Sequence, residues 1–377
     1  MKRRDFLKSA GLGAVGLMGA NILTKTTNEP ITNTAAAASN VANPVPGTDG
    51  DKYIAPSERT GKESVVYFTR DLSPAGLVKI YDKISTNLTG KIAVKLHTGE
   101  QHGPNIIPAP WVKELFDQKL SNATIVETNT YYEGDRYTTE DHRKTLEVNG
   151  WTFSPVDIMD EDGTAMFPLT GGKWFTEMSM GKTLSNYDSF LALTHFKGHM
   201  MGGFGGSNKN IGIGNADGRI GKKMIHSSNS QWDIAEEELM ERISESTKAT
   251  LEHFGDNISY INVMRNMSVS CDCEGVNAQP VVTPNVGILG STDILAIDQA
   301  SVDLVFAMKE SDNHDLKERM ISRHGLRQLS YMKELGMGND RYILLDIDNN
   351  DAPISLADAV KDVKPFTKNS ICTSFGC

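Results

Sequence analysis

The chain has 377 residues, of which 39% are hydrophobic and 23% are charged, and its formal net charge is −10. This is the composition of an ordinary globular protein with ample material for a core, and it excludes disorder as the main state. The acidic balance also argues against a nucleic-acid-binding protein, because phosphate recognition needs a basic surface. A local basic pocket is still compatible with it.

The first 38 residues have the features of a twin-arginine export signal. Arg3 and Arg4 precede an apolar run at residues 10–23 that is too short and glycine-rich for a membrane span, and residues 35–38 are the small alanines that a signal peptidase prefers. We therefore expect the twin-arginine translocase to export the protein to the periplasm, the cell envelope or the exterior. Because this pathway carries folded proteins, the signal also favours a cofactor inserted in the cytoplasm.

Two kinds of segment alternate after a linker at residues 39–60 that is rich in Asn, Pro, Gly, Thr and Asp. Short, branched, apolar segments are typical of strands, at residues 91–97, 123–127, 190–194, 258–263 and 342–347. Amphipathic patterns predict helices at residues 77–88, 111–120, 139–149 and 234–254. We therefore predict an α/β fold with a largely parallel central sheet flanked by helices, over a core domain at residues 61–347 and before a tail at 348–377. The length of the domain favours two lobes.

The first candidate segment is KLHTGEQHGP, where a predicted strand runs directly into His97 and Glu100. Ligands of open α/β sheets bind where strands end and loops begin. An imidazole close to a carboxylate suits metal ligation or general acid-base catalysis. The alternative is a polar loop that caps the next helix.

The second candidate is the glycine-rich, lysine-rich and histidine-rich segment at residues 194–226, THFKGHMMGGFGGSNKNIGIGNADGRIGKKMIH. Successive amides of glycine-rich backbone can converge on an anion, and lysines add point charges. The segment has no Walker or GxGxxG pattern, which disfavours an ordinary nucleotide site. The alternative is an exposed flexible loop. We predict a cofactor or anion cradle made of Gly202, Gly203, Gly205, Gly206, Lys209, Asn210, Gly212, Gly214 and Lys222.

The third candidate is SVSCDCEG, in which only Asp272 separates Cys271 from Cys273. A disulfide between cysteines so close in the chain would be strained, so metal ligation or disulfides with Cys372 and Cys377 are the favoured uses. Thiolates with imidazoles suit iron, zinc, copper or nickel, whereas two cysteines alone do not hold an iron–sulfur cluster. The metal ligands that we predict are His195, His199, His226, Cys271 and Cys273.

A strand followed by a helix is predicted in NVGILGSTDILAIDQASVDLVF, and Asp298 lies on that helix. A solvated helical carboxylate is the more common outcome, and a carboxylate that faces the site is the alternative. With that alternative, the candidate catalytic residues are His97, Glu100, Lys197 and Asp298.

The order of these segments, from about residue 65 to residue 345, resembles the bacterial and archaeal family called domain of unknown function 362. Its members are often described as uncharacterised iron–sulfur centre proteins, and many insert a ferredoxin-like module with two CxxCxxCxxxC runs after the equivalent of KKMIH. This chain continues there as SSNSQWDIAEEELMERI, without cysteine. The resemblance therefore implies a member without ferredoxin-type clusters. The residues shared with the family pattern are His97, Glu100, Asn129, His142, His195, Lys197, His199, Lys209, Asn210, His226, Cys271, Cys273 and Asp298.

Together these features predict an exported redox protein or enzyme that depends on a metal or another cofactor. His97 and Glu100 would transfer protons, while Lys197 and Lys209 would hold negative charge on a small-molecule substrate. A separate partner protein would supply electrons. Two alternatives are open: a non-catalytic exported protein that binds an anionic small molecule or a metal, and a structural protein whose cysteines all form disulfides.

Overall fold

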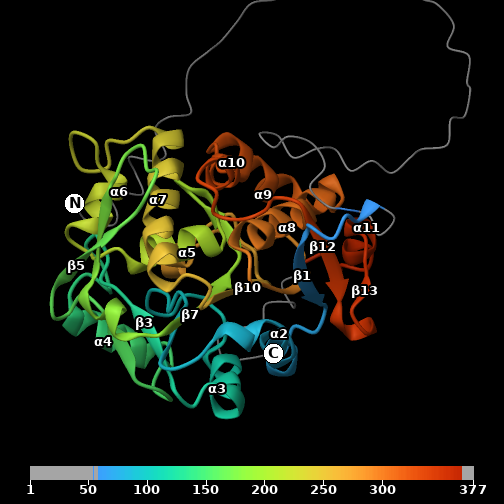
Figure 1. The fold of residues 1–377 in the computed structure, drawn as a ribbon, viewed down its shortest axis with the longest axis horizontal. Helices are drawn as coiled ribbons and strands as arrows, with labels where there is room; N and C mark the ends of the chain where they lie inside the picture. The colour runs from blue at the N-terminus through green and yellow to red at the C-terminus, as the bar shows by residue number, and fades with distance from the viewer. Residues whose placement is uncertain (1–53, 55–57, 367–377) are drawn as a thin grey trace, which may run out of the picture.

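The computed structural model describes residue 54 and residues 58–366 (Figure 1). The predicted export signal, most of the linker, and Cys372 and Cys377 lie outside the described residues.

One nine-stranded sheet runs through the described part of the chain. In spatial order its strands are β13 (Ala352–Pro353), β12 (Tyr342–Asp346), β1 (Ser64–Thr69), β11 (Gly287–Ser291), β10 (Ile258–Met264), β7 (Ser189–His195), β2 (Ile92–Lys95), β3 (Ala123–Glu127) and β4 (Val156–Ile158). The five strands from β10 to β4 are mutually parallel, and β1 is parallel to β12. Only β11 and β13 run antiparallel to their neighbours. The predicted α/β fold with a largely parallel sheet is confirmed, and its strands form one sheet where chain length favoured two lobes.

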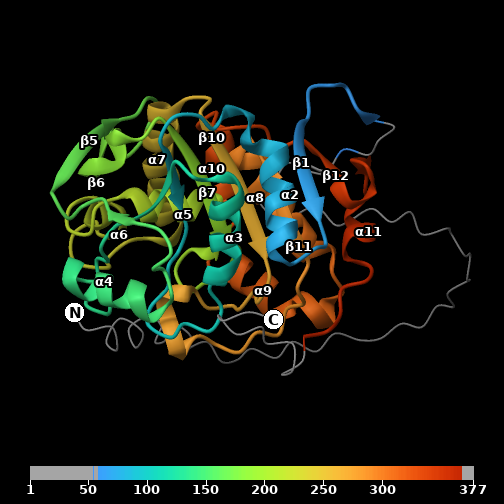
Figure 2. The same ribbon diagram turned by 90° about the horizontal axis from the view of Figure 1, so that it is seen from below.

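Helices cover both faces of this sheet. One face packs against α2 (Pro74–Ile84), α3 (Ala109–Lys119) and α4 (Thr139–Val148), and Figure 2 looks onto the side where α2 and α3 lie. The other face packs against α5 (Ser207–Asn215), α6 (Gly221–His226), α7 (Glu236–Phe254), α8 (Ile294–Ala307), α9 (Glu310–Ser322), α10 (Arg327–Glu334) and α11 (Leu356–Val360). Side chains of β7 alternate between these two cores, as the pleat of a strand requires: Phe190 and Ala192 face one, Leu191 and Leu193 the other.

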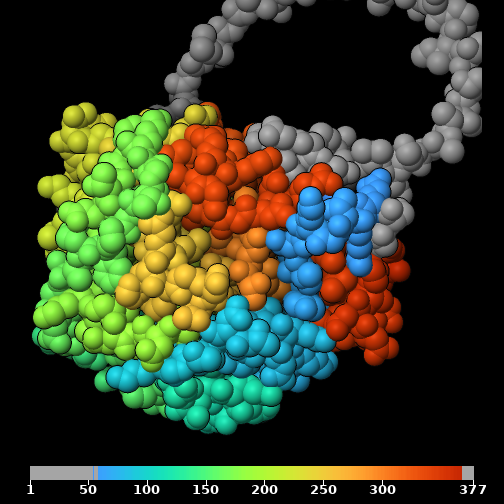
Figure 3. Space-filling model, in the orientation of Figure 1, coloured from blue at the N-terminus to red at the C-terminus, as the bar shows by residue number. Residues whose placement is uncertain are grey.

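Short elements complete the chain. Two hairpins pair β5 (Thr164–Pro168) with β6 (Glu177–Gly181) and β8 (Lys197–His199) with β9 (Gly203–Gly205). The 3₁₀ turns are η2 (Ser85–Asn87), η3 (Lys182–Asn186), η4 (Asp272–Asn277) and η5 (Ile347–Asn349). In the space-filling view, the C-terminal elements lie directly beside the N-terminal strand, as the β1–β12 pairing requires (Figure 3). No helix within the described ranges is long and apolar enough to cross a membrane.

The glycine-rich segment is not the exposed loop that was the alternative. It forms the end of β7, the β8–β9 hairpin, α5 and α6, and most of its residues are buried. It therefore belongs to the packed body of the protein.

Candidate functional site

A cavity opens at the carboxyl ends of the parallel strands β2, β3 and β7, where open α/β sheets bind their ligands. Its volume is about 830 Å³ including the open mouth. Five cationic side chains but only one carboxylate line it: Lys95, Arg136, Lys197, Lys209 and Lys222, against Glu127. Although the whole chain is acidic, cationic side chains outnumber carboxylates in the lining of this cavity.

The three candidate segments meet at this cavity. Of the eighteen predicted site residues, twelve line it: His97, Lys197, His199, Gly205, Gly206, Lys209, Asn210, Gly214, Lys222, His226, Cys271 and Cys273. The six that do not line it are Glu100, His195, Gly202, Gly203, Gly212 and Asp298.

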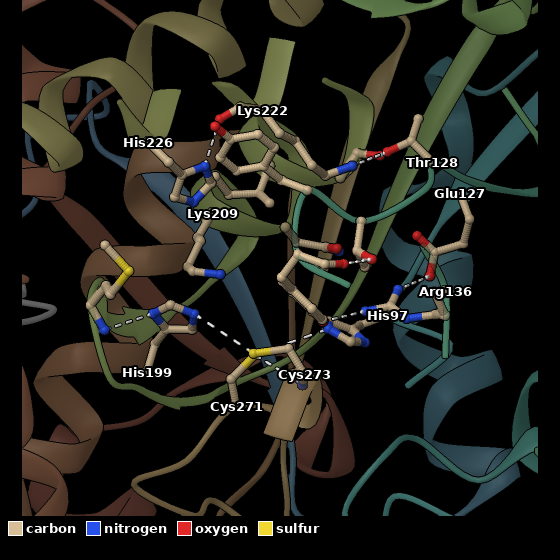
Figure 4. A pocket seen from close by; sticks show the side chains of 18 of the residues that line it. His97, Glu127, Thr128, Arg136, His199, Lys209, Lys222, His226, Cys271 and Cys273 are labelled. Atoms are coloured by element: carbon tan, nitrogen blue, oxygen red, sulfur yellow. Dashed lines mark hydrogen bonds and ion pairs between the residues drawn. The ribbon is translucent and has the colours of Figure 1, made fainter. Parts of the chain in front are cut away.

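Two cysteines and two histidines form one wall of the cavity (Figure 4). One potential ligand atom from each of His199, Cys271 and Cys273 lies within 4.8 Å of the others. Nε2 of His199 is 3.9 Å from Sγ of Cys273, and Nε2 of His97 is 4.0 Å from Sγ of Cys271. Ligands of a tetrahedral zinc ion are about 3.5 Å apart, so this wall is a candidate site for a soft metal ion.

The hydrogen bonds of the two histidines nevertheless favour another role. Nδ1 of His199 accepts from the amides of Met201 at 3.1 Å and Gly202 at 2.8 Å, and Nδ1 of His97 accepts from the amide of Gly99 at 3.0 Å. A neutral imidazole with an accepting Nδ1 carries its hydrogen on Nε2. A metal-bound histidine has the opposite arrangement, in which its other nitrogen donates. Both imidazoles therefore point Nε2–H donors at the sulfur atoms.

Both histidines are neutral at pH 7. Burial lowers the pKa of His199 to about 4, and the nearby charge of Lys209 acts in the same direction. Burial also lowers the pKa of His97.

The two thiols are unequal. Cys271 is 2% exposed and is the N-cap residue of η4, where its Sγ lies 3.4 Å from the amide nitrogen of Cys273. Burial alone would raise the pKa of Cys271, but a hydrogen bond from Cys273 and the charge of Lys209 hold it well below its usual range. The same hydrogen bond, followed by burial, raises the pKa of Cys273 well above its usual range. These opposite shifts favour a thiolate at Cys271 and a thiol at Cys273.

His195 does not fit the predicted role of metal ligand, because both of its ring nitrogens are engaged by oxygen atoms. Nδ1 lies 2.8 Å from a carboxylate oxygen of Asp272, and Nε2 lies 2.7 Å from the carbonyl oxygen of Arg265. Lys197 is 3.1 Å from the same Asp272 carboxylate. His195 and Lys197 thus fix Asp272, and with it the backbone that carries the two cysteines.

Glu100 also lies outside the cavity, so the expected proton transfer with His97 has no support. Its carboxylate accepts from the Tyr132 hydroxyl at 2.5 Å and from Arg136 at 3.1 Å. Arg136 lies 3.7 Å from Glu127, which forms a 2.8 Å ion pair with Lys95. Glu100 therefore belongs to a buried ion network whose other charged members, Lys95, Glu127 and Arg136, line the cavity.

Asp298 caps a helix and does not reach the cavity. Its carboxylate accepts from the first amides of α5, those of Ser207 at 2.7 Å and Asn208 at 2.9 Å, and from the Asn262 amide at 2.9 Å. Burial raises its pKa to about 6. A Cβ at Gly206 would lie 2.5 Å from this carboxylate, so the glycine permits the close approach. The amides at this helix end are thus unavailable to a ligand.

The predicted glycine cradle makes room for protein side chains. A Cβ at Gly214 would lie 2.0 Å from Cε of Lys95, and one at Gly205 would touch Lys197 and Lys209. A Cβ at Gly202 would lie 3.3 Å from side-chain atoms of His199 and Lys209, whereas a Cβ at Gly203 or Gly212 would meet the backbone of Gly325 or Ile243. The cationic side chains, rather than backbone amides, form the anion-attracting surface.

Three of the lysines that line the cavity have partners in the protein. Lys95 pairs with Glu127 and Lys197 with Asp272. Lys222 donates to the Thr128 hydroxyl at 2.5 Å and to the carbonyls of Asn129 at 2.6 Å and Ala216 at 2.9 Å. Burial lowers the pKa of Lys222 to about 8.

Lys209 differs from these lysines, because no hydrogen-bond or ion-pair partner for its ammonium occurs among the described residues. It projects from α5 into the cavity, between His199 and His226 (Figure 4). Asn210, the next residue, instead braces the strand ends by donating to the Lys95 carbonyl and the Thr194 hydroxyl.

The opposite side of the cavity is aromatic. Tyr131 lies 4.9 Å from Trp232 and 6.2 Å from His226, measured between ring centroids. Nδ1 of His226 lies 2.7 Å from the Lys222 carbonyl and donates to it, so its Nε2 is an acceptor. Burial lowers the pKa of His226 to about 3. His226 is thus the predicted ligand with a free lone pair, but it is not part of the cysteine cluster.

Several residues of the site were not predicted from the sequence, chiefly Lys95, Glu127, Arg136, Tyr131 and Trp232. Two of them could have been predicted from the sequence. Lys95 and Glu127 are charged residues at the ends of otherwise apolar strand segments, AVK and IVE. A buried charge at such a position needs a partner.

Comparisons with known proteins give a family but no activity. Residues 92–303 match the family described as Domain of unknown function (DUF362). No curated protein matches the chain. Among solved structures, the lactate racemase apoprotein from Thermoanaerobacterium thermosaccharolyticum is 14% identical with a TM-score of 0.35, covering 62% of this chain and 55% of that one. A protein from Thermotoga maritima is 12% identical with a TM-score of 0.32, covering 50% and 49%. The chain thus spans about half the length of these two proteins, and neither similarity bears on activity.

Proposed function

The chain belongs to the DUF362 family, and from that premise and the chemistry of the cavity we propose that it is an exported redox enzyme whose reactive group is the Cys271–Cys273 pair. The observation that carries this proposal is the thiol pair itself, which faces the cavity and is met by two imidazole N–H donors. Thiolates at such cationic, hydrogen-bonded positions are nucleophiles, whereas thiols buried among apolar groups are inert.

The reaction that suits this pair is thiol–disulfide exchange with a bound disulfide. The Cys271 thiolate attacks one sulfur of the substrate, a protein–substrate S–S bond forms, and the substrate's own S–S bond breaks to release a thiolate. Cys273 then passes its proton to the released thiolate and attacks the Cys271 sulfur. A second thiolate leaves and a Cys271–Cys273 disulfide remains, and the strain expected of a bridge between cysteines so close in the chain makes it easily reduced. Two electrons have passed to the substrate, and an external dithiol returns the pair to its reduced form.

The surrounding residues have separate tasks in this reaction. The Nε2–H of His97 donates to Sγ of Cys271 and that of His199 to Sγ of Cys273, and hydrogen bonding by both histidines favours the Cys271 thiolate before the attack. His195 and Lys197 keep Asp272 fixed between the two cysteines, so that the thiols stay close to each other. Positive charge around the cavity favours the thiolates that form and leave.

An aromatic disulfide reagent tests the proposal, in a chain whose Cys372 and Cys377 are replaced by serine. With 5,5′-dithiobis(2-nitrobenzoate), we expect the reduced pair to release two thionitrobenzoate anions per chain and to keep no adduct. Cys273→Ser is the matched control: it should release one anion and keep a mixed disulfide on Cys271, visible by intact mass. A stable adduct on the unmodified pair, with no second release, would exclude Cys273 as the resolving thiol.

A second candidate function is a metal-dependent redox centre, favoured by the convergence of His199, Cys271 and Cys273 within 4.8 Å. These residues would hold a soft ion, which would supply redox or Lewis-acid chemistry. If Nε2 of His199 were a metal ligand, the hydrogen on Nε2 would have to move to Nδ1. The hydrogen bonds from the amides of Met201 and Gly202 to Nδ1 would then have to break. The thiol mechanism needs no such rearrangement, and for that reason we place it first.

Export by the twin-arginine translocase, and supply of electrons by a separate protein, are further parts of this proposal. They rest on Arg3 and Arg4 with the apolar run after them, and on the absence of ferredoxin-type cysteine runs in the sequence. Fractionation of cells that express the full chain or an Arg3→Lys, Arg4→Lys variant tests the export.

A further inference from the structure

We infer that the cavity takes an anionic ligand with a planar aromatic part, whose charged group pairs with Lys209 and whose ring lies against Tyr131, Trp232 and His226. This inference rests on the proposed function, because it names the class of substrate for the same cavity.

We place the charged group of the ligand beside Lys209, because the other cationic side chains of the cavity already pair with oxygen atoms of the protein. Lys95 and Arg136 face Glu127, Lys197 faces Asp272, and Lys222 donates to three oxygen atoms. The Lys209 ammonium has no such partner in the described part of the chain. A half-buried ammonium is stabilised by a charge-assisted hydrogen bond, and an anionic ligand in the cavity would supply one to Lys209.

Packing holds Lys209 in this position. Its side chain leaves α5 and runs past Gly202 and Gly205: a Cβ at Gly202 would lie 3.3 Å from Cδ and Cε of Lys209, and one at Gly205 would lie 3.8 Å from Cδ. Lys209 and both cysteines line the same cavity. An anionic group bound at Lys209 would therefore hold the rest of the ligand beside the thiol pair.

The aromatic part of the ligand is assigned to the opposite side. Trp232 lies 4.9 Å from Tyr131 and 5.2 Å from His226, between ring centroids, so three rings meet at the cavity. A planar ligand can pack against such a group of rings by stacked or edge-to-face contact. Nε2 of His226 offers an acceptor for an N–H or O–H of that ligand, because its Nδ1 donates to Lys222.

The backbone at Trp232 is consistent with a ligand contact. Its φ is 68°, a left-handed conformation that a bulky residue rarely adopts. Such a conformation is strained and is typical of functional positions. The loop between α6 and α7 thus holds the indole ring at the cavity at some cost in stability.

Calorimetric titration with matched probes tests the inference: 2-naphthoate, its neutral analogue 2-naphthamide, and inorganic phosphate as an anion without a ring. We expect the unmodified protein to bind 2-naphthoate at least about tenfold more tightly than either other probe, since only 2-naphthoate offers both the charge-assisted hydrogen bond and the ring contacts. Lys209→Met should reduce the preference for naphthoate over naphthamide to less than about threefold. Lys223→Met, an exposed lysine on α6 that does not line the cavity, removes the same charge and should keep the preference. Trp232→Ala should weaken both naphthyl probes alike.

Each outcome bears on the ligand class. Equal affinities for naphthoate and naphthamide, or a preference that survives Lys209→Met, would overturn the assignment of the anion. Phosphate binding as tight as naphthoate, or naphthyl binding unchanged in Trp232→Ala, would overturn the aromatic part. If Lys209→Met fails to fold, Lys209→Gln serves in its place. The proposed function fails separately: a thiol pair that does not react with the disulfide reagent, in a protein that prefers naphthoate, would refute the redox role and leave the ligand class standing.

Discussion

In a chain whose Cys372 and Cys377 are replaced by serine, iodoacetamide is expected to modify Cys271 at a rate that falls far less than tenfold per pH unit between about pH 8 and pH 6. The pKa of Cys271 lies well below its usual range, so its thiolate persists as the pH falls until the pH drops below that lowered value. An ordinary thiol near pKa 8.5 loses about tenfold in rate for each unit below it. Because a thiolate of low pKa is also a weaker nucleophile, we expect an advantage of only about tenfold at pH 6.

Variants separate the causes of this reactivity. Cys271→Ser should abolish the reaction at pH 6 and leave only slow modification of Cys273, because burial still raises the pKa of that thiol when Cys271 is gone. Cys273→Ala removes the hydrogen bond that lowers the pKa of Cys271 most, and should move the onset of reactivity to higher pH. Cys273→Ser keeps a donor and is the matched control. A Cys271 rate that rises tenfold per pH unit in the unmodified pair would show an ordinary thiol, and the proposed mechanism would lose its nucleophile.

The second large effect concerns stability. Glu127→Gln is expected to lower the free energy of unfolding by about 3–5 kcal/mol, because it leaves buried cations without their carboxylate. The side chains of Lys95 and Glu127 are only 2% and 3% exposed and form a 2.8 Å ion pair. Urea unfolding at pH 7 measures the loss. Asp117→Asn is the control, since Asp117 pairs with Lys113 on the surface and should change stability by less than about 1 kcal/mol.

The effect of Glu127→Gln also has a defined pH dependence. Burial by itself would raise the pKa of Glu127, but Lys95 and Arg136 hold it well below its usual range. A carboxylate with a depressed pKa stabilises the protein fully above the unfolded value, about 4.3 for glutamate, and the contribution is lost as the pH falls below it. The difference between the two proteins should therefore be largest near pH 7 and shrink below about pH 4. Similar losses for Glu127→Gln and Asp117→Asn would contradict the buried network.

Local patterns allowed much of the fold to be predicted. Parallel strands buried on both faces are continuous apolar runs, so β2, β3, β7, β10 and β12 fall within or across the ranges predicted for them. The pairing of those strands was less accessible, because it depends on contacts far apart in the sequence. The antiparallel insertion of β11 between β1 and β10 is of this kind.

The candidate site was predictable by residue type but not by partner. His97, His199, Cys271 and Cys273 have side chains of recognisable chemistry, and the structure brings them together. Glu100, His195 and Asp298 have equally suitable side chains, yet each is engaged by groups from distant segments: Arg136, Asp272 and the start of α5. A sequence shows which side chains have reactive groups. Burial and hydrogen-bond partners, which depend on the fold, determine which of those groups remain available in the cavity.

The glycine-rich segment shows the same limit. Glycines permit close approach, and the prediction took the approaching group to be a ligand. In the structure that group is a lysine side chain at Gly214 and a carboxylate at Gly206. Which group packs against a glycine depends on the tertiary fold, so the sequence pattern alone did not predict that group.

One measurement tests the central claim, that the Cys271–Cys273 pair is a thiol centre whose histidines donate to sulfur. It is elemental analysis combined with a thiol count, on protein matured with its export signal and purified without oxygen. We predict far less than one metal ion per chain, with Cys271 and Cys273 both recovered as reactive thiols. One ion per chain that disappears in Cys271→Ser and in His199→Gln would contradict the claim, and the metal centre would then be the function of this wall.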